Sequence, residues 1–111
     1  MKLSKAQLKA IDKAKKSIAE ARMFDKYEDW LRHHIPYYSK FTDREIREET
    51  RQGMDYTEYW EKGKQGIVLT SAGKNTIEAL VKMGIFEVVE YSNYRHNGVI
   101  DWVKYNENWE A

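Results

Sequence analysis

The residue type that recurs most regularly near the start of this sequence is lysine. Five lysines follow one another at intervals of three or four residues: Lys2, Lys5, Lys9, Lys13 and Lys16. Because residues at this spacing share one face of an α-helix, their amines would form a single positive stripe. Such a stripe suits a polyanion or an acidic protein surface as partner. The alternative is an ordinary solvated helix face.

The charges are unevenly distributed along the 111 residues. Residues 1–22 hold seven basic and two acidic side chains, a net charge of +5, whereas residues 23–62 carry −3 and residues 63–111 carry −1. The total of only +1 excludes both the globally basic class of nucleic-acid binders and the acidic disordered class. A basic segment therefore precedes a neutral to acidic body.

Catalytic and metal-binding residue types occur without the spacing that their chemistry needs. The chain has no cysteine, which excludes disulfides, Cys-ligated zinc and thiol catalysis. His33 and His34 are adjacent, whereas a helical metal site needs histidines four residues apart; we expect one in solvent and one against Tyr37 and Tyr38. The run 73–76 lacks the glycine and hydroxyl positions of a phosphate loop. We expect no enzymatic activity, no metal and no cofactor.

The length predicts a single domain over residues 1–111, with a helical part (1–63) and a strand-helix-hairpin part (64–111). The longest apolar run, residues 66–69, is far too short to cross a membrane. Residues 1–5 meet no hydrophobic signal segment. We therefore expect a cytoplasmic protein without a membrane partner.

Four capping-box patterns mark helix starts in the first 60 residues: Ser4-x-x-Gln7, Asp25-x-x-Glu28, Thr42-x-x-Glu45 and Asp55-x-x-Glu58. They predict helices over residues 5–23, 26–34, 43–53 and 56–63. Pro36 should end the second helix. Gly53 and Gly63 suit the left-handed position that follows a helix.

The pattern changes after Gly63. Residues 66–69 read as a buried strand and residues 72–83 as a helix, with Gly84 and Ile85 forming its Schellman end. Residues 85–92 and 99–105 read as two strands joined by a hairpin at Asn97-Gly98. The sequence thus predicts an α+β fold in which helices precede a helix and a small three-stranded antiparallel sheet.

Residues 66–105 resemble the back half of a winged helix-turn-helix domain. The shared pattern is a capped helix with Thr76-Ile77-x-x-Leu80, then Gly84-Ile85, a strand, a turn and a returning strand. The resemblance implies double-stranded DNA as partner, with the helix at 72–83 as reader and the loop at 93–98 as wing. The alternative is that this helix and hairpin form a structural module only.

The resemblance also implies which residues meet DNA. They are Ser71, Lys74, Asn75, Glu78, Lys82 and Arg95, supplemented by Lys5, Lys9 and Lys13. Asparagine can pair with adenine, lysine with guanine or phosphate, and Glu78 with a cytosine amine. The wing Arg95 would reach the minor groove or a phosphate. The lysine side-chain amines of the first helix would add attraction that is independent of base sequence.

Aromatic residues, 14% of the chain, suggest a second function. Tyrosine and tryptophan suit protein interfaces as well as small cores, and we expect several to be partly exposed. The alternative to a DNA binder is therefore an interaction module for a host protein; a homodimer stays open. In size and composition the chain is similar to small accessory proteins of bacteriophages and mobile elements. Lysines of the first helix that share a face with Lys74, Lys82 and Arg95 would favour DNA, whereas lysines that face away would favour the interaction module.

Overall fold

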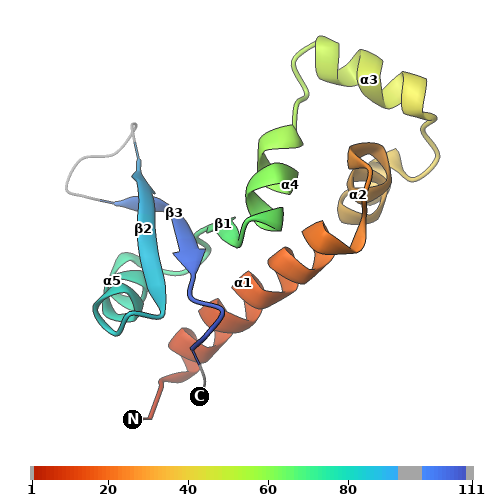
Figure 1. Cartoon of the computed structure of the whole chain (residues 1–111). Coiled ribbons are helices and arrows are strands. Elements are labelled where there is room, and N and C mark those ends of the chain that lie inside the picture. The colour runs from red at the N-terminus through yellow and green to blue at the C-terminus, as the bar shows by residue number, and fades with distance from the viewer. Residues whose placement is uncertain (1, 93–98, 110–111) are drawn as a thin grey trace.

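A computed structural model describes residues 2–92 and 99–109 of the chain (Figure 1). The elements in these ranges are α1 (Lys5–Met23), α2 (Tyr27–His34), the 3-10 turn η1 (Pro36–Tyr38), α3 (Asp43–Arg51), α4 (Thr57–Lys64), β1 (Ile67–Leu69), α5 (Lys74–Lys82), β2 (Phe86–Tyr91) and β3 (Ile100–Tyr105). The expected α+β fold, with helices followed by a three-stranded antiparallel sheet, is confirmed.

The sheet has the order β1-β3-β2, and β3 is antiparallel to both neighbours. Val103 at its centre pairs with Val68 of β1 and Val88 of β2 and is fully buried. Trp102 is covered by α4, since the Tyr59 ring lies 5.4 Å away and the Lys62 amine 4.2 Å away, centroid distances in both cases. The hairpin turn expected at residues 97–98 lies outside the described residues.

The hydrophobic side chains form two cores, and α1 contributes to both. Its Ala10, Ile11, Ala14 and Ile18 pack with β1, α5, β2 and β3 in an aliphatic core. One turn further on, Ala21 belongs to a second, aromatic-rich core with residues of α2, η1, α3 and α4. Figure 1 shows α1 running diagonally from the sheet and α5 to the α2–α4 end.

Two of the four expected capping boxes are present. Ser4 and Thr42 each accept a hydrogen bond from the backbone three residues on, and the side chains of Gln7 and Glu45 return the contact. The boxes expected at Asp25 and Asp55 are wrong, because α2 and α4 begin one residue later, after Lys26 and Tyr56, without a side-chain cap. Asp55 instead accepts from the Thr57 amide at 2.9 Å, a local turn.

The glycine predictions hold at two positions of three. Gly53 and Gly84 have positive φ, and the Ile85 amide donates to the Leu80 carbonyl at 3.0 Å, which completes the expected Schellman end. The cap expected at Gly63 is wrong, since α4 continues through it and Gly66 takes the positive φ. A Cβ at Gly63 would lie 2.8 Å from the Ala21 Cβ, so this glycine permits close packing of α4 on α1.

The molecule is elongated, with principal extents of 48 × 31 × 20 Å. Its radius of gyration, 15.5 Å, exceeds the roughly 13 Å expected for a compact domain of this length. The α3 helix lies at the far end from the sheet (Figure 1). Two cores in a row along one helix explain this shape.

Candidate nucleic-acid interface

The α5 helix presents the face that the winged-helix resemblance implies as reader. Ile77 and Leu80 are buried in the aliphatic core. Asn75, Glu78 and Lys82 follow the helical spacing of three and four residues on a different side, where Asn75 and Lys82 are exposed and Glu78 is half-buried. The structure therefore brings these three expected residues onto one face.

Lys74 and Glu78 approach one another one turn apart on α5. The Lys74 amine lies 3.8 Å from the Glu78 carboxylate, and both side chains are exposed by more than two fifths. An exposed pair at this spacing is weak and screened by salt. Its effect is to lower the positive charge at the start of α5.

The α1 lysines lie outside the apolar stripe and are exposed. Within residues 2–19 the one carboxylate is Asp12, and the ion pairs of the described residues include none of the six lysines there. Lys5 and Lys9 precede Lys13 by two turns and one turn. This row is a positive surface without internal neutralisation.

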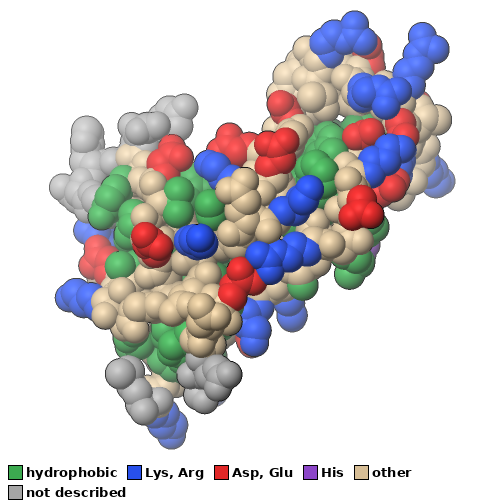
Figure 2. Space-filling view, viewed as in Figure 1, with side chains coloured by type: hydrophobic (Ala, Val, Ile, Leu, Met, Phe, Trp, Pro, Cys, Tyr) green, Lys and Arg blue, Asp and Glu red, His purple; other side chains and the backbone are tan. Residues whose placement is uncertain are grey.

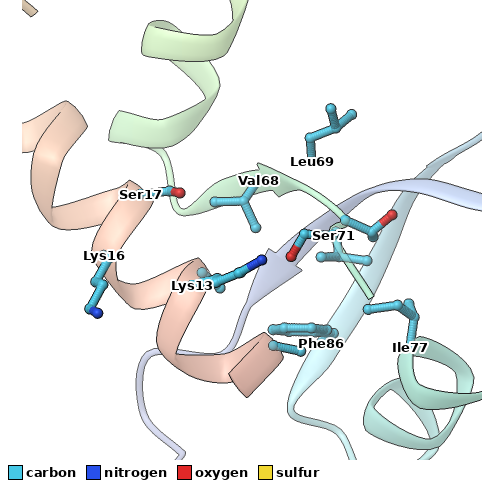
Figure 3. Close-up of a pocket in the computed structure, with 12 residues that line it drawn as sticks. Lys13, Lys16, Ser17, Val68, Leu69, Ser71, Ile77 and Phe86 are labelled. Atoms are coloured by element: carbon cyan, nitrogen blue, oxygen red, sulfur yellow. The ribbon is translucent and has the colours of Figure 1, made fainter. Parts of the chain in front are cut away.

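The loop between β1 and α5 approaches the lysine row at Lys13. A pocket of about 230 Å³ is lined by Lys13 from α1, by Ser71 from the loop, and by side chains of β1, α5, β2 and β3. Figure 3 shows the Lys13 amine directed over the pocket towards Ser71, while Lys16 points away from β1. Two residues expected at a DNA interface, 58 positions apart in sequence, are thus placed together.

A neighbouring pocket of about 250 Å³ continues round the same loop. It shares Thr70 and Ile77 with the first pocket and adds Lys74 and Asp101. The loop is fixed to the sheet, because the Thr70 amide donates to the Asp101 carbonyl at 2.8 Å and its hydroxyl to the Ile100 carbonyl at 2.9 Å. Lys13 and Lys74 therefore lie beside the anchored loop that carries Ser71, whereas Arg95 lies outside the described residues.

Both α2 histidines approach a single α1 carboxylate, which sequence reasoning missed. His34 Nδ1 lies 2.5 Å from Glu20 Oε1, and His33 Nε2 lies 3.6 Å from Oε2. His34 also stacks on Trp30, with ring centroids 4.7 Å apart. The expected contact of a histidine with the tyrosine corner is not observed, because α1 passes beside the end of α2. Nothing in the spacing of Glu20 and His34 signals their contact.

Ion pairs hold α3 against α2. Asp43, at the first turn of α3, pairs with Lys26 and Arg32, and Arg32 also donates to the Phe41 carbonyl at 2.7 Å. The Lys26 ammonium, and next the Arg32 guanidinium, lower the pKa of Asp43 to about 2. These charges serve the fold at the end of the molecule away from α5.

The expectation of partly exposed aromatics is confirmed. Trp30, Tyr38 and Trp60 are buried, whereas Tyr37, Tyr59 and Tyr91 are exposed by 69%, 42% and 55%. Figure 2 shows acidic and basic side chains interspersed with apolar ones over the face seen in Figure 1. Exposed aromatics are thus distributed over several elements.

The described residues hold no cluster of three or more His, Cys, Asp or Glu side chains arranged to bind a metal ion. Among the same residues, none of the helices combines the length and apolarity that crossing a bilayer requires. Comparison of the chain with family models, with curated proteins and with solved structures finds no match.

Proposed function

We propose that this protein binds double-stranded DNA. In this proposal α5 enters the major groove with Asn75 and Lys82 facing the bases, while Lys5, Lys9 and Lys13 of α1 contact phosphates. Ser71, Lys74 and Glu78 border the same contact, and Arg95, which lies outside the described residues, stays an expected contact of the minor groove or a phosphate. The protein would then act as a small regulatory DNA binder.

One observation carries this proposal: the lysine row of α1, which has no ion pair within the part of the chain that the structure describes, meets the start of α5 at the anchored loop. Lys13 and Ser71 line the same pocket, and Lys74 lines the next. Unneutralised lysines beside an exposed helix face give both the salt-dependent attraction and the readout surface that duplex DNA needs. The order of α5 followed by the antiparallel strand pair β2–β3 also agrees with the winged-helix resemblance.

Fluorescence anisotropy with a random-sequence duplex tests the proposal, with salt varied from about 50 to 200 mM. Each lysine that contacts a phosphate contributes about −0.9 to the slope of log affinity against log salt. We expect Lys9→Ala and Lys13→Ala each to make the slope shallower by about that amount. Lys15→Ala is the matched control, since Lys15 lies on the other flank of α1, beside Tyr105 and Trp109. Absence of binding at 50 mM salt contradicts the proposal.

Base readout is tested separately by selecting bound duplexes from a random pool. We expect the double variant Lys74→Ala/Asn75→Ala to lose the sequence preference of the unaltered protein while keeping most of its non-specific affinity. An unchanged preference would remove α5 as the reader.

An interaction module for a host protein is the second candidate, and one observation favours it. Tyr59 and Leu69, exposed by 42% and 46%, line a pocket of about 240 Å³ together with Trp30 and Trp102. Exposed apolar side chains round a hollow are typical of protein-binding sites. A photoreactive residue at Leu69 should cross-link a defined partner under this candidate, whereas one at the similarly exposed Leu8 should not.

A further inference from the structure

The pocket between α1, β1 and α5 opens from the surface into the aliphatic core. Its floor includes Val68, Phe86 and Ile77, which are exposed by 8%, 3% and 3%, with Val103 fully buried behind them. The α1 wall is built from Ala10 and Ala14, whose short side chains leave space opposite Val68. In Figure 3 the polar groups stand at the rim, with Lys13 on one side and Ser71 on the other.

We propose that this pocket binds a small organic anion whose apolar group enters the core and whose carboxylate meets Lys13. The volume sets the size of the apolar group. An apolar cavity of about 150 Å³ accommodates benzene, and this pocket has about 230 Å³. A phenyl or branched alkyl group with a short carboxylate arm therefore fits.

The charge of the ligand follows from the rim. The described residues that line the pocket include Lys13 and Lys16 but no Asp or Glu. Lys13 has no carboxylate partner among the described residues, and the Ser71 hydroxyl can donate to an anion. The two neighbouring pockets of similar volume differ, because one is lined by Asp101 and the other by Glu20. Of these three pockets, only the first has an apolar floor and charged lining residues that are all basic.

This ligand chemistry has two natural sources. One is a free aryl or alkyl carboxylic acid, and the other is a peptide that ends in a large apolar residue, because its terminal carboxylate lies beside its side chain. Both would place an apolar group against Val68 and Phe86 and an anion at Lys13. The inference does not rest on DNA binding, so either proposal can fail alone.

Titration calorimetry and amide chemical shifts of the full chain test the pocket. The probes are 3-phenylpropionate, its neutral analogue 3-phenylpropan-1-ol, and acetate. We expect 3-phenylpropionate to bind with a dissociation constant of about 1 mM or below and to shift amides of residues 68–71 and 103. The alcohol should bind about tenfold more weakly, because a neutral hydroxyl replaces the charged carboxylate as the partner of the Lys13 ammonium. Acetate, which lacks the apolar group, should not bind.

The variants Lys13→Met and Lys15→Met form a matched pair on one helix. Both remove one charge and keep the aliphatic stem, but Lys15 lies on the flank away from the pocket. We expect Lys13→Met to weaken 3-phenylpropionate about tenfold and Lys15→Met to leave it unchanged. Equal losses in both, equal affinity for acid and alcohol, or no binding of the acid would each overturn the proposal.

A peptide pair distinguishes the two sources. Acetyl-Gly-Phe with a free carboxylate and its C-terminal amide differ only in the charge. Binding of the acid form as tight as that of 3-phenylpropionate would identify a peptide C-terminus as ligand, and much weaker binding would identify a free acid. Loss of this binding in Lys13→Met is required in either case.

Discussion

The two ends of this molecule use charge in opposite ways. At the α2–α4 end, basic side chains pair with carboxylates: Lys26 and Arg32 with Asp43, Arg47 with Glu28, and Arg51 with Glu48. At the other end, Lys2 and the five lysines of α1 up to residue 16 have no such partner among the described residues. The difference separates charges that orient helices from charges that are left for a binding partner.

The hydrophobic cores of the two ends also differ, in the kind of side chain that fills them. The core beneath the sheet is mostly aliphatic, with Leu80 and Val103 fully buried. The core at the α2–α4 end is mostly aromatic, built around Trp30, Tyr38 and Trp60. Short helices with few residues each contribute large rings there, because an aromatic side chain buries more area per residue. A small assembly of eight- and nine-residue helices can be stable on that basis.

Removal of one large aromatic ring from the second core should cause the largest change in the free energy of unfolding. Trp60→Ala deletes a buried side chain whose Nε1 donates to the Ala21 carbonyl at 3.1 Å. We expect a loss of about 3–5 kcal/mol in the free energy of unfolding, because burial and a cavity term add. Chemical denaturation measures it, with the exposed Tyr37→Ala as control. A loss below about 1 kcal/mol would mean that the aromatic core tolerates collapse.

Equal charge removal at the two ends separates binding from folding. The double variant Lys9→Ala/Lys13→Ala should make the salt slope of duplex affinity shallower by about 1.8. Arg44→Ala/Arg47→Ala removes the same charge at the ion-paired end and should leave the slope unchanged. Equal changes in both variants would show that only net charge matters and would remove the α1 surface as a defined site.

Acid should weaken the attachment of α3 before it affects the lysine surface. The folded pKa of Asp43, about 2, lies below the ordinary value of 3.8, so the stabilisation is complete above about pH 4 and is lost as pH falls towards 2. Denaturation midpoints of the protein and of Asp43→Asn should therefore differ at pH 5 and converge near pH 2. Asp25→Asn, at an exposed carboxyl nearby, serves as control. Parallel curves throughout would rule out the Asp43 ion pairs as the cause.

The smallest effect is expected from removing the Glu78 charge beside Lys74. Glu78→Gln removes the carboxylate 3.8 Å from the Lys74 amine and should raise duplex affinity about twofold to fivefold at low salt. The control is Glu61→Gln on the exposed side of α4. A weaker complex would instead indicate that Glu78 itself accepts a hydrogen bond from a base.

Local chemistry made much of the fold predictable. Ser4 and Thr42 carry hydroxyls that cap a helix within three residues, and Gly84 ends α5 where the backbone needs a positive φ, so these ends were predicted correctly. Gly63 was assigned the wrong role because its reason is the close approach of Ala21, 42 positions earlier. A contact between distant helices leaves no local signal.

The candidate site likewise combines features that local spacing predicts with features that depend on contacts between distant segments. Helical spacing alone placed Asn75, Glu78 and Lys82 on one face of α5. The pairing of Lys13 with Ser71 across a pocket depends on how α1 packs against β1, which follows from long-range burial. The alanines at positions 10 and 14 were the available signal, since small residues in a buried stripe leave room for a pocket.

The passage of α1 through both cores has a consequence for local opening. An amide in the centre of α1 can exchange with solvent only when the packing on one side of the helix is released. Between Ala14 and Ala21, the aliphatic core protects one part of the helix and the aromatic-rich core protects the next. Opening either core therefore strains the other through a shared backbone. The slowest-exchanging amides should lie in this stretch, whereas α3, with Ile46 as its one buried residue, should exchange first. The chain would then unfold from its α3 end inwards, with α1 as the last element to lose protection.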